Sequence, residues 1–177
     1  MSNDVNVQEE LLENNKSALE NIPSEKYLTF FIDGQLYAIP SSEVVEIIRM
    51  QPITFMPKLP DFVKGVINLR GKIVPLIDLR LKFDLEERAY DDHTSIIVIE
   101  HGELSIGFIV DTVNDVTDIA ENQISGAPKL AKNEGGNYVS GIVHLEKNVA
   151  LLLDIMKILE RADAVQTKNI VESDELE

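Results

Sequence analysis

The residues of this sequence that are best suited to chemistry are its three histidines and its neighbouring carboxylates. His93, His101 and His144 stand in separate predicted loops or strands, and no two of them have the spacing of metal ligands. The acid pairs at 86–87 and 91–92 fall in a polar connector, where a solvated surface explains them better than acid–base catalysis does. We therefore expect these side chains to lie at the surface, with a loose divalent-cation site left open as an alternative.

Other catalytic and cofactor motifs are missing from the sequence. Because there is no cysteine, disulfides, thiolate zinc sites, iron–sulfur clusters and cysteine nucleophiles are excluded together. Gly135-Gly136 lies in a polar stretch, not in a phosphate loop, and no serine sits in a nucleophile elbow. The sequence therefore predicts a binding module with no cofactor and no metal, and an unrecognised enzyme is the least favoured alternative.

The charge of the chain is large and unevenly distributed. A net charge of −15 over 177 residues argues against nucleic acid as a partner, since phosphates must be neutralised by Lys and Arg. Residues 49–82 carry seven bases against two acids, whereas residues 89–128 carry eight acids and no base. Such asymmetry can steer and orient protein partners. The alternative is a solvated acidic surface that only keeps the protein soluble.

The two ends are polar and acidic, each with six acids and two bases (residues 1–26 and 160–177). No base precedes Lys16 and the apolar runs fall far short of the ~20 residues that span a bilayer, so we expect a cytoplasmic protein without direct membrane insertion. The first segment has few apolar residues, which favours a flexible leader over residues 1–26 rather than a short amphipathic helix. We expect the tail at 162–177 to fray.

Between the ends the pattern predicts many short strands and few helices, as in barrels or a sandwich. Two short helices are expected after Asp78 and Asp154, because aspartate is a good N-cap. The expected strands cover residues 27–32, 36–39, 44–49, 62–69, 73–77, 95–100, 104–110, 139–145 and 149–153.

An internal repeat organises these strands into two related halves. Residues 62–79 align without a gap to residues 138–155, with eleven of eighteen positions identical or near-isosteric. A weaker similarity links residues 31–39 to 99–107 through Gly34/Gly102. Neither half is expected to bury enough surface alone, so we expect them to pack as one unit. Arg70 aligns with Glu146, and this charge reversal at an exposed hairpin tip indicates a binding role for Arg70.

Two motifs stand out in the first copy of the repeat, GVINLRG at 65–71 and PLIDLR at 75–80. Together with residues 45–47, residues 107–111, Val113, Val116, Gly141 and Asp154, they resemble the signature of the CheW-like chemotaxis coupling proteins. The resemblance covers about residues 26–160. It implies a mainly β fold of two five-stranded SH3-like barrels related by a pseudo-two-fold, with short helices. On this basis we expect one CheW-like domain at 27–161, its subdomains at about 27–88 and 93–160, with an exchange of strands between them left open.

The resemblance also implies a function and its partners. Proteins of this family have no known catalysis, and they link the cytoplasmic tips of methyl-accepting chemoreceptors to the histidine kinase CheA, whose regulatory domain is similar to the adaptor. The implied protein is cytoplasmic, recruited to membrane-bound receptor arrays, and a monomer when isolated. The family's receptor-binding positions correspond to Glu46, Gly65, Arg70, Ser95 and Gly107. Kinase contacts at the barrel ends would involve Ile39, Val44, Lys129 and Leu130.

Two alternatives to this interpretation remain. The protein could serve a chemotaxis-like pathway with another output, or resemble relatives that carry a receiver domain. Since the sequence ends at Glu177, it has no room for a receiver of ~120 residues, which disfavours the second. For Arg70, an internal salt bridge to Glu46 or Asp78 is the structural alternative, and it can coexist with binding.

Overall fold

In the computed structural model the chain is mainly β, with two sheets and few short helices. The structure describes residues 3–20, 22–126 and 138–159. Helices α1 and α2 span Asn3–Glu20 and Leu79–Lys82, 3₁₀ turns η1 and η2 span Ser41–Glu43 and Glu121–Gln123, and residues 155–159 are also helical. The strands are β1 Ser24–Ile32, β2 Gln35–Pro40, β3 Val44–Arg49, β4 Val63–Leu69, β5 Lys72–Asp78, β6 Ser95–His101, β7 Leu104–Val110, β8 Thr112–Ala120, β9 Ile124–Gly126, β10 Val139–His144 and β11 Val149–Leu153.

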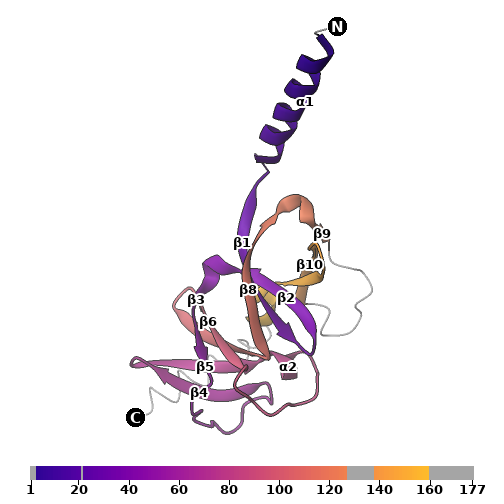
Figure 1. Ribbon diagram of the computed structural model, residues 1–177. Helices are drawn as coiled ribbons and strands as arrows, with labels where there is room; N and C mark the ends of the chain where they lie inside the picture. Colours follow the sequence, from indigo (N-terminus) through magenta and orange to yellow (C-terminus); the bar gives the residue numbers. More distant parts are fainter. Residues whose placement is uncertain (1–2, 21, 127–137, 160–177) are drawn as a thin grey trace.

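The N-terminal segment differs from the sequence prediction, because a helix forms where a flexible leader was favoured. Its Glu, Gln, Leu, Lys and Ala residues are strong helix formers, which outweighs the small number of apolar side chains. Helix α1 projects away from the strands (Figure 1), and Val7, Leu11 and Leu12 are each more than half exposed. These three side chains therefore add nothing to the core.

The two sheets exchange hairpins between the halves of the chain. One sheet has six strands in the order β8-β1-β2-β11-β10-β9, and the other has five in the order β3-β6-β7-β5-β4. The β1–β2 hairpin thus pairs with strands of the second half, and β6–β7 pairs with strands of the first (Figure 1). The boundaries at 27–88 and 93–160 follow the sequence repeat but not the sheets, and the exchange that the sequence left open is present. The expected count of five strands holds for only one sheet.

The strong repeat is also a structural repeat. The two hairpins β4–β5 and β10–β11 have matching register shifts, between Val63 and Gly65 and between Val139 and Gly141. The weaker similarity, between residues 31–39 and 99–107, is shifted by one residue from the structural equivalence. In the parallel pairings Leu76 lies opposite Gly107, and its counterpart Leu152 lies opposite Ala38, so Ala38 rather than Ile39 corresponds to Gly107.

Three groups of buried side chains form the core. Ile96 and Val98 point into a cluster within the five-stranded sheet, and a second cluster fills the six-stranded sheet around Ala38. Ile97 and Ile99, on the other face of β6, join a larger cluster that includes Phe30 from the opposite sheet. Each sheet therefore has its own small interior, and the largest cluster joins the two sheets, as expected for halves that pack as one unit.

Candidate functional site

The tip of the β4–β5 hairpin presents Arg70. Leu69 and Lys72 pair across a two-residue turn in which Arg70 and Gly71 have φ angles of 53° and 84°. Two successive positive φ angles match the right-handed twist of the strands and make a tight hairpin. The Gly71 amide also donates a hydrogen bond to Asn68 Oδ1 at 2.8 Å. The turn is therefore well fixed, and it leaves the Arg70 side chain 73% exposed.

Arg70 forms an ion pair with Glu46, so the structural alternative is present. Arg70 Nη2 donates to Glu46 Oε2, and the carboxylate is the more buried partner. Asp78, the other partner considered, is engaged elsewhere. Because Glu46 holds one end of the guanidinium and most of the group remains in solvent, Arg70 can still donate to an acceptor on another molecule.

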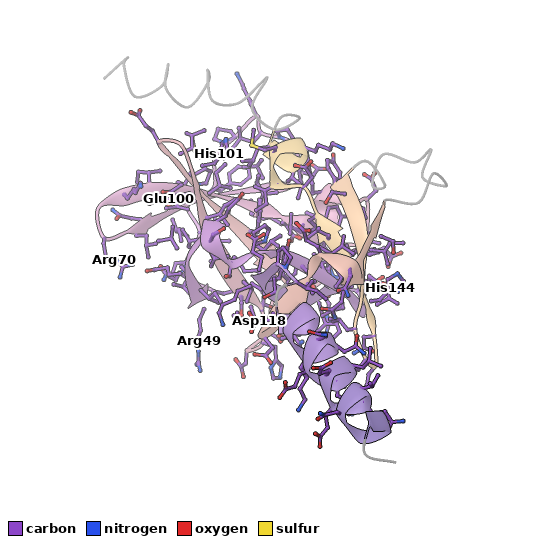
Figure 2. The ribbon with its side chains drawn as sticks, turned by 90° about the horizontal axis from the view of Figure 1, so that it is seen from above. Arg49, Arg70, Glu100, His101, Asp118 and His144 are labelled. Atoms are coloured by element: carbon purple, nitrogen blue, oxygen red, sulfur yellow. The ribbon has the colours of Figure 1, made fainter. Side chains whose placement is uncertain are left out.

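The edge strand that carries Glu46 also carries a positive charge and exposed apolar side chains. Glu46 lies on β3, an edge strand whose Val45 and Ile47 are 52% and 43% exposed. Arg49, Arg70 and Glu100 lie on one side of the molecule and His144 on the other (Figure 2). We call Val45, Glu46, Ile47, Arg49 and Arg70 the β3 edge surface.

Two predicted receptor-binding glycines have packing roles instead. A Cβ at Gly65 would lie 2.2 Å from the backbone oxygen of Thr54, and its φ of 137° suits only glycine. A Cβ at Gly107 would lie 2.5 Å from Leu76 Cδ2 and 2.7 Å from Ile96 Cγ2. Both glycines are buried, so neither lines an accessible surface. Close approach within the fold explains both glycines, and a receptor contact at Gly65 and Gly107 stays a prediction.

The remaining predicted positions are spread over the fold. Ser95 is half-buried at the start of β6, opposite Arg49, and donates to the His93 carbonyl at 3.1 Å. Ile39 is fully buried in the largest cluster, so its side chain does not reach the surface, and its kinase contact stays a prediction. Val44 is half-buried against the same cluster. Lys129 and Leu130 lie outside the described residues.

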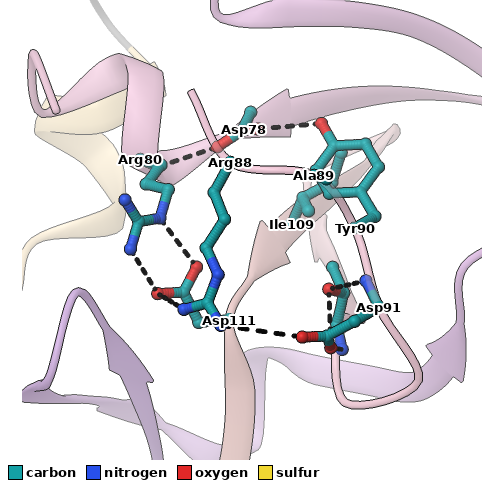
Figure 3. Close-up of a pocket in the computed structure, with 9 residues that line it drawn as sticks. Asp78, Arg80, Arg88, Ala89, Tyr90, Asp91, Ile109 and Asp111 are labelled. Carbon is teal, nitrogen blue, oxygen red and sulfur yellow. Dashed lines mark hydrogen bonds and ion pairs between the residues drawn. The ribbon is translucent and has the colours of Figure 1, made fainter. Parts of the chain in front are cut away.

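A buried ionic cluster around Arg80 was not predicted (Figure 3). The Arg80 guanidinium donates to both carboxylate oxygens of Asp111 at 3.0 Å each, and to Asp33 Oδ1 at 3.0 Å. Asp33 lies in the β1–β2 turn, Asp111 between β7 and β8, and Arg80 in α2. Arg80 therefore connects the exchanged hairpin to the other sheet. The sequence does contain a signal for this cluster, because Arg80 is a base inside the apolar segment that follows the capping Asp78.

The charges of this cluster stabilise one another. Burial by itself would raise the pKa of Asp111, but the hydrogen bonds and charge of Arg80, the Asp33 amide and the charge of Arg88 together hold that pKa below its ordinary value. The hydrogen bond from Arg80 to Asp111 raises the pKa of Arg80 further. The enclosed space is about 10 Å³, scarcely one water molecule. The cluster is thus an internal clamp with no room for a ligand.

Tyr90 covers the same cluster from the connector between α2 and β6. Its hydroxyl donates to Asp78 Oδ2 at 2.8 Å, while Asp78 Oδ1 accepts from the Arg80 amide at 2.9 Å and caps α2. Burial and the hydrogen bond to Asp78 raise the pKa of Tyr90 well above its ordinary value, so the phenol stays protonated.

The described residues contain no group of three His, Asp or Glu that could hold a metal ion. Within the same ranges no helix has the length and apolarity needed to cross a membrane. The candidate site is the β3 edge surface, which includes Arg70.

Comparisons with known proteins agree on one family. A family model described as "CheW-like domain" matches residues 26–163. The chain is 36% identical over 149 residues to the chemotaxis protein CheW of Klebsiella aerogenes, covering 84% of this chain and 90% of that protein. It is 34% identical over 137 residues to the chemotaxis protein CheW of Bacillus subtilis, covering 77% and 88%.

A solved structure is similar over the same region. The crystal structure of the scaffolding protein TtCheW from Thermoanaerobacter tengcongensis superimposes with a TM-score of 0.70 at 32% identity. The match covers 75% of this chain and 90% of that one.

Proposed function

Since this chain belongs to the family of CheW-like domains, we propose that it is a non-catalytic adaptor that couples methyl-accepting chemoreceptors to the histidine kinase CheA. The observation that carries the proposal is Arg70, an exposed cation on a tightly turned hairpin, oriented by Glu46. Its counterpart in the second repeat is Glu146, so the fold itself needs no cation at this tip. A guanidinium in this position suits the carboxylates and terminal carbonyls of a helical receptor tip.

The receptor contact would use the β3 edge surface. Exposed Val45 and Ile47 provide apolar area on the same edge strand as Glu46, and an amphipathic helix buries its apolar face against such an area. Ser95 lies next to Arg49 in the ladder and is a candidate for the rim of this contact.

The same proposal places the protein in the cytoplasm, recruited to receptor arrays in the membrane. An adaptor with two partners gains strength from simultaneous attachment, because the second contact is made at a high effective concentration. Individual contacts can then be weak, and the isolated protein can be a monomer.

A reconstitution tests the proposal. Receptor cytoplasmic fragments, the kinase CheA and this protein are mixed, and both kinase activity and co-sedimentation are measured. We expect the kinase to sediment with receptors and to respond to them only when this protein is present. If wild-type protein binds neither partner in separate titrations, the proposed function is wrong.

A further inference from the structure

The Asp78 site has a counterpart in the second repeat, and the two differ in what covers them. Asp154 is the equivalent of Asp78, and its Oδ1 likewise accepts from a helix amide, that of Lys157 at 3.3 Å. In the first repeat the second oxygen of Asp78 is taken by Tyr90. In the second repeat the structure describes no side chain that donates to the second oxygen of Asp154.

A groove opens at Asp154 because two strands separate there. The parallel pairing of β5 and β7 continues to Asp78 opposite Ile109. The equivalent pairing of β11 and β2 ends earlier, at Leu152 opposite Ala38. The space between Pro40 and Asp154 forms a groove of about 180 Å³, which is large enough for an aromatic side chain.

The residue that follows the capping aspartate by two positions also differs between the two sites, and in the groove it favours an apolar ring. Two residues beyond the capping aspartate, the first repeat has Arg80 and the second has Met156. Arg80 is buried in its clamp, whereas Met156 is 42% exposed and lines the groove. Exposed methionine is common at binding surfaces, since its flexible thioether packs well against aromatic rings.

The charge of the groove indicates which sequence would enter it. Glu43 and Asp154 line it, and neither has an ion-pair partner among the described residues. The chain's own ends are poor occupants, because residues 1–26 and 160–177 each have a net charge of −4 and contain no tyrosine. The connector at the Asp78 site has a sequence that would suit the groove better. In this connector Arg88 precedes Tyr90 by two residues and lies within 4.0 Å of Asp111.

We infer that the groove between β2 and β11 binds an extended segment of a partner protein that presents a tyrosine preceded two positions earlier by a basic residue. The ring lies on Met156, the hydroxyl donates to Asp154, and the base faces Glu43. The molecule thus offers a partner the same contact that its own connector makes in the first repeat. This inference rests on the proposed function only in that an adaptor needs partner surfaces.

The test is a titration of the full chain with short capped peptides, followed by amide chemical shifts. The probe is a nine-residue glycine- and serine-flanked peptide with Arg-Ala-Tyr at its centre, and the matched peptide has Arg-Ala-Phe. We expect saturable shifts at Glu43, Asp154 and Met156, and binding about fivefold weaker for the phenylalanine peptide, which lacks the hydroxyl. Met156→Arg should weaken binding about tenfold or more, because it fills the groove and repels the base.

Val149→Arg is the control, because Val149 is 48% exposed at the other end of β11. This variant should bind the peptide like wild type. Equal binding of the two peptides, shifts that map away from the groove, or no effect of Met156→Arg would overturn the inference. So would binding that develops only after residues 162–177 are removed, because the tail would then be the occupant. Receptor and kinase titrations of wild type separate a failure here from a failure of the proposed function.

Discussion

Arg70 and Glu46 join the two edges of the five-stranded sheet. Glu46 lies on the edge strand β3 and Arg70 at the tip of the hairpin that ends in the other edge strand, β4. Their ion pair therefore closes the sheet on itself at one end, which fits a small barrel. It also fixes the direction of the guanidinium while leaving the side chain 73% exposed.

Arg70→Ala should separate binding from folding. Since the Arg70 side chain is 73% exposed, we expect a loss of less than about 1 kcal/mol in the free energy of unfolding. Binding of a receptor fragment should weaken at least several-fold, and binding of the kinase regulatory domain should persist. A melt and two titrations measure these effects.

Arg70→Lys is the matched variant for this position. It keeps the charge and loses the forked donor, so it should restore receptor binding only in part. If Arg70→Ala unfolds early and loses both partners together, Arg70 is structural and the assignment is wrong.

Gly65→Ala should destabilise more than Gly141→Ala, although the two glycines are equivalent in the repeat. At Gly65 the new Cβ meets the Thr54 carbonyl at 2.2 Å on a backbone with positive φ, which should cost at least about 3 kcal/mol. At Gly141 the nearest atom is the Ser125 carbonyl at 2.9 Å, so about 1–2 kcal/mol is expected. Urea titrations of the two variants and wild type measure the difference.

Equal losses at the two positions would contradict this ranking. If Gly65→Ala folds like wild type but binds receptor poorly, the receptor-binding prediction for Gly65 would be supported.

Asp111→Asn should remove part of the acid sensitivity of the fold. Because the folded pKa of Asp111 lies below its unfolded value, its stabilisation is fully present above the unfolded pKa of about 3.9 and is lost as pH falls through the folded pKa. The variant should lose about 3 kcal/mol near neutral pH, since Arg80 loses its main partner. Wild-type and variant stabilities should converge as the pH is lowered below about 4. Parallel curves down to the lowest pH at which both fold would show that Asp111 does not titrate differently on folding.

Removal of residues 1–22 should leave the fold intact. Val7, Leu11 and Leu12 of helix α1 are exposed, so we expect the Tm to change by less than about 2 °C. Pro23 must be kept, because its carbonyl accepts from the Glu121 amide at 3.1 Å. Removing residues 1–26 is the contrasting variant, since it deletes the ladder positions Ser24–Lys26 opposite β8 and should destabilise. A large loss in the shorter deletion would mean that α1 packs on the strands in solution.

Most of the fold is readable from the sequence because its strands have strong patterns. The nine expected strands are all present, and the repeat predicts the equivalence of the two bulged hairpins, as the registers around Gly65 and Gly141 confirm. The strands β8 and β9, both at edges of the six-stranded sheet, were missed. The only fully buried side chain of β8 is Ile119, so its sequence has little apolar alternation, and β9 has only three residues, none of them fully buried.

The parts of the site that could not be predicted depend on distant contacts. The charge reversal at the hairpin tip singled out Arg70, and Glu46 was named as its internal partner. The clamp of Arg80 on Asp33 and Asp111 joins three segments that only the hairpin exchange brings together. No local pattern reports such a contact, and the same holds for the separation of β2 from β11.

The hairpin exchange has a consequence for the order in which the protein can be made. The strands β1 and β2 leave the ribosome first, but β8 begins at Thr112 and β11 ends at Leu153. At a synthesis rate of about 5–20 residues per second, the hairpin waits roughly 6–22 s for the last of its sheet partners. During this time the five-stranded sheet can be completed, since all its strands precede Thr112. Leu28, Phe30 and Ile32 of the waiting hairpin meanwhile lack part of their final cover, so nascent chains are most open to aggregation or chaperone binding at this stage.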